Sequence, residues 1–275
     1  MRVYEVDLQK EYAFVAGGRL SCILMDCPSD AIENWKRPAV IVVPGGGYRH
    51  VSKREGEPIA SAFLNRGFQT FILWYTVEEG ARYPKPLLQL SAAVDYVKKN
   101  AEAFNVNPEE VFVVGFSAGG HLTGNLAVEY QNIPEKFGVK VDCKPTAVGL
   151  CYPVISKEHG HQGSYNQLLN GYTEEEKEEL LKTLNLNEAV SDVTPPAFIW
   201  STVEDAAVPS DNALRYAMAL DQHNIAYELH IYPKGPHGRS TGDLEVNPPS
   251  PALAKIKHWV DDCAEFFRMY TVEQF

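Results

Sequence analysis

The sequence predicts a three-layer α/β fold, in which helices cover both faces of a mostly parallel sheet and antiparallel strands come first. Three observations support this prediction. Continuous apolar runs, typical of strands covered on both faces, alternate along the chain with stretches of helical periodicity. The first 26 residues alternate instead between polar and apolar. A length of 275 residues with 45% hydrophobic residues is enough for one large core, so we expect a single domain over 1–275.

The N-terminal segment is expected to form the antiparallel part of the sheet. Residues 1–26 alternate around Gly17-Gly18, which favours short antiparallel strands, with residues 13–15 and 20–24 among them, joined by a tight turn. A loop is expected from Pro28 to Pro38.

From residue 39 onward, strand and helix patterns alternate. Apolar or alternating runs predict strands at 39–43, 68–75, 111–116, 147–152, 197–202 and 227–232. Helical patterns are found at 59–64, 86–104, after Ser117, at 210–223 and at 253–270. This alternation favours a parallel sheet, because parallel strands need a crossover connection between them.

Residues 154–195 interrupt this rhythm. Ser156 to Gly163 is polar and contains two histidines, and Thr173-Glu174-Glu175-Glu176 predicts a capping box that begins an acidic helix. We expect this segment to be a small cap-like insertion above the strand ends.

Composition excludes several classes of protein. A net charge of −11 with no basic cluster argues against nucleic acid or an anionic membrane as a partner. The first seven residues contain no apolar signal segment, and no apolar run approaches the roughly 18 residues of a membrane span. We therefore expect a cytoplasmic protein. Five cysteines in no metal-ligand spacing are expected to be idle thiols: Cys22, Cys27, Cys143, Cys151 and Cys263.

The stretch around Ser117 is the centre of the predicted chemistry. The β-branched run at 111–114 ends in Gly115-Phe116-Ser117-Ala118-Gly119, and small residues then begin a helix. A G-x-S-x-G motif between a strand and a helix is typical of a nucleophilic serine held on a sharp turn. Glycines on both sides allow the strand and the helix to approach closely. By itself the motif is also compatible with a tight turn that happens to contain serine.

Other reactive side chains follow the ends of other strands. Gly45-Gly46-Gly47 follows the run at 39–43, Glu204 and Asp205 follow the strand at 197–202, and His237 follows the strand at 227–232. The carboxyl ends of parallel strands meet at one edge of a sheet, where active sites collect. The order of serine, acid and histidine along the chain is the order expected of an α/β-hydrolase sheet.

These residue types suit acyl transfer. His237 would take the proton of Ser117 and return it to the leaving group, and an acid would orient the imidazole. We favour Asp205 over Glu204 as that acid, since Asp205 begins a turn and Glu204 has the longer arm. Main-chain N–H groups of Gly46, Gly47 and Ala118 could bind the oxyanion.

Other candidate residues have simpler interpretations. The glycine loop lacks the lysine of a nucleotide P-loop. His121 is expected to be structural. His159 and His161 resemble a metal pair, yet no acidic or cysteine partner has ligand spacing, so we expect neither a metal nor a cofactor. Among the aromatic residues that could contact substrate, Tyr48 is the best candidate because it adjoins the glycine loop; the others are Trp74 and Tyr83.

The chain resembles the α/β-hydrolase superfamily. The motifs Pro44-Gly45-Gly46-Gly47-Tyr48, Arg54 to Ala60 and Gly115 to Leu122 are similar to those of the esterase/lipase group, in particular acetylxylan-esterase-like and feruloyl-esterase-like sugar-ester hydrolases. The resemblance extends from about residue 38 through Pro195 to Trp200, Asp205 to Pro209 and Pro236-His237-Gly238.

The resemblance implies a role for each matching residue. Ser117 would be the nucleophile, Asp205 the acid and His237 the base, with Gly46, Gly47 and Ala118 as oxyanion donors. Pro44 departs from the histidine that many members have before the three glycines, so a polar anchor of this loop is lost.

The expected activity is the hydrolysis of small acyl esters through an acyl-enzyme, with O-acetylated sugars or xylo-oligosaccharides as the substrate class. A peptidase or an amidase such as a formamidase would use the same residues, and a non-catalytic ligand-binding protein could use the same fold. The expected partner is a small ester, with a homodimer as the expected assembly.

Overall fold

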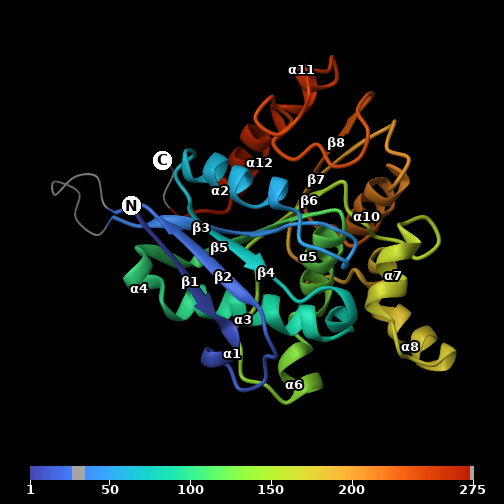
Figure 1. Cartoon of the computed structure of the whole chain (residues 1–275), viewed down its shortest axis with the longest axis horizontal. Helices are drawn as coiled ribbons and strands as arrows, with labels where there is room; N and C mark the ends of the chain where they lie inside the picture. Colours follow the sequence, from blue (N-terminus) through green and yellow to red (C-terminus); the bar gives the residue numbers. More distant parts are fainter. Residues whose placement is uncertain (27–34, 273–275) are drawn as a thin grey trace.

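The structure is a computed structural model that describes residues 1–26 and 35–272. Its centre is one eight-stranded sheet with the order β1-β2-β4-β3-β5-β6-β7-β8 (Figure 1). The strands are β1 (Arg2–Asp7), β2 (Arg19–Leu24), β3 (Arg37–Val43), β4 (Gln69–Trp74), β5 (Val106–Phe116), β6 (Val148–Cys151), β7 (Ala197–Thr202) and β8 (Tyr227–Tyr232). The pairs β1–β2 and β2–β4 are antiparallel and the other pairs are parallel, which confirms the α/β fold class.

Helices cover both faces of the sheet (Figure 1). The longer helices are α2 (Glu57–Leu64), α3 (Lys85–Lys99), α5 (Ala118–Glu129), α8 (Glu174–Leu184), α10 (Asp211–Gln222) and α12 (Trp259–Arg268). The shorter helices are α1 (Leu8–Glu11), α4 (Ala101–Phe104), α6 (Ile133–Phe137), α7 (Gln162–Leu168), α9 (Leu186–Ala189), α11 (Leu253–Ile256) and the 3₁₀ turns η1 (Lys53–Glu55) and η2 (Glu78–Ala81).

Two cores explain the continuous apolar runs. In β3, Val40 and Val42 belong to the core beneath α2 and α12, whereas Ile41 and Val43 belong to the core beneath α3 and α5. Successive side chains in a strand point to opposite faces. A strand with a helix on each face therefore needs an apolar residue at every position, and β3 is fully buried from Ala39 to Val43.

The N-terminal prediction was right about the antiparallel pairing and wrong about the connection. The chain leaves β1 into α1, because the Asp7 side chain accepts a hydrogen bond from Gln9 N and caps the helix. Residues 13–15 are not a strand. Val15 is buried in the core instead, and Phe14 packs against it.

The predicted loop from Pro28 to Pro38 lies mostly outside the described residues. Residues 35–36 have no regular structure, and β3 begins at Arg37, two residues before the predicted strand.

Two predicted helices are each divided. The pattern at 86–104 becomes α3 and α4, separated at Asn100, whose side-chain Nδ2 donates to Tyr96 O, the carbonyl that also accepts from Asn100 N. The pattern at 253–270 becomes α11 and α12, and between them His258 N bonds to Lys255 O with a three-residue spacing. Apolar periodicity continued across both breaks because the pieces bury the same side.

The segment between β6 and β7 contains α7, α8 and α9. The predicted capping box at Thr173 and Glu176 is present at the start of α8. Leu184 and Leu186 are fully buried, and both belong to the same core as the buried side chains of α3 and α5. The role of residues 154–195 as a cap stays a prediction, as does the single-domain division of 1–275.

The described cysteines are expected to be unreactive because their thiols are buried. Cys22, Cys143, Cys151 and Cys263 are free and buried, and Cys27 lies outside the described residues. Burial raises the pKa of Cys22 to about 12 and that of Cys143 to about 11, which keeps both as thiols. Within residues 1–26 and 35–272, no helix is long and apolar enough to cross a membrane.

Candidate active site

Ser117 stands at the junction of β5 and α5 in a strained backbone conformation. Its φ of 53° and ψ of −116° are rare for a residue with a side chain. Main-chain hydrogen bonds hold this turn, since Ser117 N donates to Cys151 O and Ser117 O accepts from Val154 N. The turn projects the hydroxyl beyond the end of the strand.

Both glycines of the motif are sterically required. A Cβ on Gly115 would lie 2.3 Å from Gly119 O, and a Cβ on Gly119 would lie 2.2 Å from Val43 O. The expectation that these glycines permit a close approach of strand and helix is confirmed.

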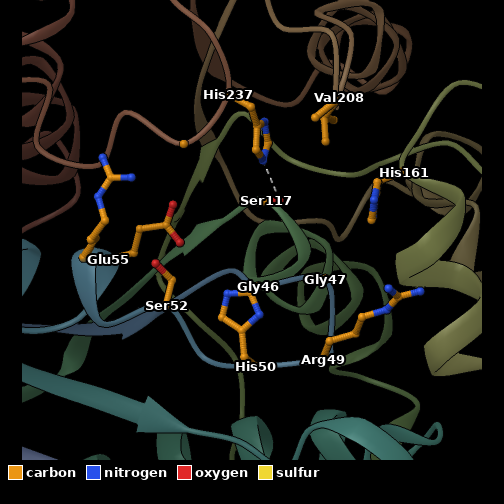
Figure 2. Close-up of a pocket in the computed structure, with 13 residues that line it drawn as sticks. Gly46, Gly47, Arg49, His50, Ser52, Glu55, Ser117, His161, Val208 and His237 are labelled. Atoms are coloured by element: carbon orange, nitrogen blue, oxygen red, sulfur yellow. Dashed lines mark hydrogen bonds between the residues drawn. The ribbon is translucent and has the colours of Figure 1, made fainter. Parts of the chain in front are cut away.

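His237 and Asp205 form a hydrogen-bonded chain with Ser117. His237 Nε2 lies 2.8 Å from Ser117 Oγ (Figure 2). His237 Nδ1 lies 2.6 Å from Asp205 Oδ2. A carboxylate only accepts, so Nδ1 carries the proton and Nε2 accepts from the hydroxyl. The buried Asp205 is oriented by two further donors, because its Oδ1 accepts from the main-chain N–H of Ala207 and of Val208.

The neighbouring acid, Glu204, lies elsewhere. Its Oε2 accepts a hydrogen bond of 2.9 Å from Gly235 N, in the loop that precedes His237. Gly235 O in turn accepts from the Thr202 hydroxyl. Of the two candidate acids, Asp205 therefore contacts the imidazole, whereas Glu204 holds the main chain of the histidine loop at Gly235.

The glycine loop after β3 faces the same cavity. Gly46 and Gly47 have φ values of 128° and 65°, and a Cβ on Gly46 would lie 2.0 Å from His50 O, so Gly46 must be glycine. Both glycines line a cavity of about 410 Å³ together with Ser117 and His237. Over residues 1–26 and 35–272, no protein acceptor takes the main-chain N–H of Gly46, Gly47 or Ala118.

Glu55 is a component of the site that sequence reasoning did not single out. It is only 5% exposed, and its Oε2 accepts from Gly45 N at 2.8 Å while its Oε1 accepts from the Tyr152 hydroxyl at 2.6 Å. The Tyr152 hydroxyl also accepts from Ser240 N, and its ring lies edge to face with His237 at 5.0 Å between centroids. One carboxylate thus connects the glycine loop with the histidine loop.

A signal for Glu55 was present in the sequence. The segment from Arg54 to Ala60 resembles the family's motif, but the resemblance assigned no role to Glu55. The departure at Pro44 removed one polar anchor of the glycine loop, and in the structure Glu55 supplies such an anchor at Gly45. The Tyr75 hydroxyl supplies another by donating to Pro44 O at 2.8 Å.

The prediction that Tyr48 contacts substrate disagrees with its position. The side chain is 1% exposed and does not line the cavity. Its hydroxyl lies 3.0 Å from His121 Nδ1, and its ring packs edge to face on Tyr75. The backbone of Tyr48 has a φ of 58°, and the chain turns there so that Gly46 and Gly47 face the cavity while the ring enters the core.

His121 is structural, as predicted. Its Nε2 lies 3.0 Å from Leu184 O, and because a carbonyl only accepts, Nε2 carries the proton and Nδ1 accepts from Tyr48. Burial lowers the pKa of His121 to about 4, so it is neutral at physiological pH. The imidazole therefore joins the glycine loop, α5 and the segment at 154–195.

His159 and His161, which resemble a metal pair in the sequence, have different surroundings. His159 Nδ1 lies 3.1 Å from Asp211 Oδ2, whereas His161 lines the cavity on the same side of Ser117 as Arg49 (Figure 2). In the part of the chain that the structure describes, no group of three or more His, Cys, Asp or Glu side chains is arranged to hold a metal ion.

Comparison with protein families and curated proteins gives consistent matches. Residues 25–220 match the model of the BD-FAE family. Endo-1,4-beta-xylanase B of Butyrivibrio fibrisolvens is 36% identical over 219 residues, which cover 78% of this chain and 34% of that protein. An acetylxylan esterase of Xylanibacter ruminicola is 32% identical over 217 residues, covering 76% and 42%. The chain thus spans about a third to two fifths of the length of these relatives.

Solved structures agree with these matches. An acetyl ester-xyloside bifunctional hydrolase from Caldicellulosiruptor lactoaceticus has a TM-score of 0.82 and 31% identity, and the match covers 98% of this chain and 96% of that one. A carboxylesterase from Lactobacillus plantarum has a TM-score of 0.85 and 25% identity, with 98% of each chain covered. The resemblance to α/β-hydrolases of the esterase group is confirmed.

Proposed function

We propose that this chain, which belongs to the BD-FAE family, hydrolyses carboxylic esters with Ser117 as its nucleophile. The observation that supports this most directly is the hydrogen-bonded chain of Ser117, His237 and Asp205 beside the main-chain N–H groups of Gly46 and Gly47, which have no acceptor among the described residues. The proposed substrates are small acyl esters, in particular O-acetyl groups on sugars or xylo-oligosaccharides. The names of an acetylxylan esterase and a xylanase among the relatives support this substrate class.

The proposed first step forms an acyl-enzyme. Ser117 Oγ attacks the ester carbonyl while its proton moves to His237 Nε2, 2.8 Å away. Asp205 keeps the imidazole in the tautomer that can accept this proton and stabilises the imidazolium that results. His237 then protonates the leaving alcohol, and the C–O bond of the ester breaks. In the second step, His237 takes a proton from water as the water oxygen attacks the acyl carbon. The bond between that carbon and Ser117 Oγ then breaks, His237 returns the proton to Oγ, and the carboxylic acid leaves.

The tetrahedral intermediate needs donors for its oxyanion. The main-chain N–H groups of Gly46, Gly47 and Ala118 are the proposed donors, since the described protein offers them no acceptor of its own. Each such donor contributes about 3–4 kcal/mol to transition-state stabilisation. Glycine suits this loop because the positive φ values turn the main chain toward the cavity.

The cavity suits a small acyl group and a polar alcohol. Ala207 and Val208 give it an apolar part, while arginine, histidine and serine side chains line much of the remainder. A volume of about 410 Å³ is in the range of a small-molecule site. The cytoplasmic location and the homodimer stay predictions of the sequence.

Hydrolysis of 4-nitrophenyl acetate tests this proposal. We expect activity in the unmodified protein, labelling of Ser117 by a fluorophosphonate probe, and loss of both in Ser117→Ala. Ser61→Ala is the matched control, because Ser61 is an exposed serine on α2, away from the cavity. Equal rates in the unmodified protein and in Ser117→Ala would contradict the proposal. Faster turnover of peptidyl or N-formyl substrates than of acetyl esters would favour the amidase alternative.

A further inference from the structure

Arg49 differs from every other arginine in the described part of the chain. The other nine arginines each have a hydrogen bond, an ion pair or a ring contact within the protein. The guanidinium of Arg49 has none among the described residues, although the chain has 36 acidic residues and a net charge of −11. It lines the cavity beside Ser117 instead (Figure 2). A charged group with five N–H donors is thus left available to a ligand.

His161, on the same side of Ser117, presents a second donor. Its side chain caps α7, and Nδ1 accepts a hydrogen bond of 3.2 Å from Ser164 N. Nδ1 therefore carries no proton in the neutral ring, and Nε2 carries one. No acceptor for that Nε2–H is present within residues 1–26 and 35–272. Burial lowers the pKa of His161, and the positive charge of Arg49 nearby acts in the same direction, so the neutral form is favoured.

The two side chains lie next to the proposed reaction centre. A Cβ on Gly47 would be 3.6 Å from Cε1 of His161, so the imidazole borders the glycine loop. The leaving alcohol must lie near His237 Nε2, which protonates it. The alcohol part of an ester bound to Ser117 therefore lies within reach of this side of the cavity.

This side of the cavity offers donors, and among the described side chains that line it none is a carboxylate free to accept. Its other neighbours, Ala207 and Val208, provide apolar surface. Among the described residues that line the cavity, Glu55 is the one carboxylate, and it is buried and already accepts from Gly45 and Tyr152. A sugar hydroxyl would need both a donor and an acceptor, whereas a carboxylate only accepts and matches the fork of a guanidinium.

We propose that Arg49 and His161 bind a carboxylate of the ester substrate, as in an O-acetylated uronic acid. This inference rests on the proposed esterase activity and narrows its substrate class. A carboxylate on the acyl part would present the same chemistry, so the test includes both positions.

Two matched substrate pairs test the inference. The first is an O-acetylated methyl glucuronoside against the corresponding O-acetylated methyl glucoside, which differ only in a carboxylate at C6. The second is 4-nitrophenyl hemisuccinate against 4-nitrophenyl butyrate, which places the carboxylate on the acyl part. We expect kcat/KM to favour the anionic member of one pair by about 10- to 100-fold, the range for hydrogen bonds to a charged group. The pair that shows the preference identifies which part of the ester carries the carboxylate.

Variants of Arg49 and His161 test whether these two residues cause the preference for the anionic substrate. Arg49→Gln should reduce the ratio of kcat/KM between the anionic and the neutral member nearly to one. Arg49→Lys should retain part of the ratio, because it keeps the charge and loses the planar fork. His161→Gln should reduce the ratio less. Lys53→Gln is the control for charge alone, since Lys53 is exposed and does not line the cavity, and it should preserve the ratio.

The outcomes separate this inference from the proposed function. If 4-nitrophenyl acetate is hydrolysed and neither pair shows a preference, the carboxylate site is wrong and the esterase proposal stands. A preference that survives Arg49→Gln also overturns the site. If no ester is hydrolysed, the proposed function itself fails.

Discussion

Glu55 accepts a hydrogen bond of 2.8 Å from the main-chain N–H of Gly45, the first glycine of the loop that borders Ser117. The same carboxylate accepts from the Tyr152 hydroxyl, which in turn accepts from Ser240 N in the histidine loop. Because an ionised carboxylate has two acceptor oxygens and no donor, it can hold both neighbours at once. Glu55 is therefore a positioning residue for the glycine loop and the histidine loop, which are far apart in the sequence and both lie beside Ser117.

Substitution of Glu55 should reduce catalysis more than substrate binding. In Glu55→Gln only one oxygen remains to accept, so either Gly45 or Tyr152 loses its partner. We expect kcat for 4-nitrophenyl acetate to fall by about 10- to 100-fold, less than the loss of a whole oxyanion donor, while KM changes little. Glu57→Gln, at an exposed position two residues away, is the control and should behave as the unmodified protein. A rise in KM with unchanged kcat would contradict the positioning role.

The acids at 204 and 205 should respond very differently to loss of charge. Asp205→Asn would leave the geometry nearly intact and favour the wrong imidazole tautomer, so kcat should fall by about 10⁴-fold. Glu204→Gln keeps an oxygen that can accept from Gly235 N, so we expect only a few-fold effect. Steady-state kinetics on one acetyl ester measures both. A larger loss at Glu204 would reverse the assignment.

Substitution of Gly119 should lower the free energy of unfolding, because of the close contact between Gly119 and β3. A Cβ in Gly119→Ala would lie 2.2 Å from Val43 O, so the main chain must move, and we expect a loss of about 3 kcal/mol or more in the free energy of unfolding. Gly138→Ala is the matched control. Its φ of 62° is also strained for alanine, but no atom lies within 4 Å of the added Cβ, so the cost should be about 1–2 kcal/mol. Urea denaturation of both variants compares them, and equal losses would argue against the close contact.

The buried imidazole of His121 predicts a pH dependence of folding. Its pKa is about 4 in the folded protein against an ordinary value of 6.5. Between these values the unfolded chain binds a proton that the folded chain does not, so stability is full above pH 6.5 and falls as the pH drops toward 4. The contribution is about 3 kcal/mol, at about 1.4 kcal/mol per tenfold change in proton affinity.

The variant His121→Gln removes this titration. We expect its free energy of unfolding, measured by urea denaturation at several pH values, to change less between pH 6.5 and 4.5 than that of the unmodified protein. Parallel curves for the two proteins would show that His121 does not cause the dependence.

Local patterns in the sequence predicted the fold class and most of its elements. A strand buried on both faces must be apolar at each position, and a helix on its face must be apolar every three or four residues, so both are visible in a short window. The errors occurred where local competition decided the structure. The chain forms α1, capped by Asp7, where a turn was predicted. Helix α3 ends before Asn100, whose side chain bonds back to Tyr96 O, although the apolar pattern continues.

The sequence by itself determined that Ser117, an acid and His237 follow the ends of parallel strands, because that placement depends only on local strand patterns and on the common direction of the strands. Tertiary structure brought Asp205, the acid that the sequence favoured, to the imidazole and Glu204 to Gly235, since the two acids are adjacent and only the path of the loop separates their carboxylates. It also turned Tyr48 into the core and brought Glu55 to Tyr152 across 97 positions of the chain. A loop side chain takes its direction from packing with distant segments, and no short window of sequence contains both partners.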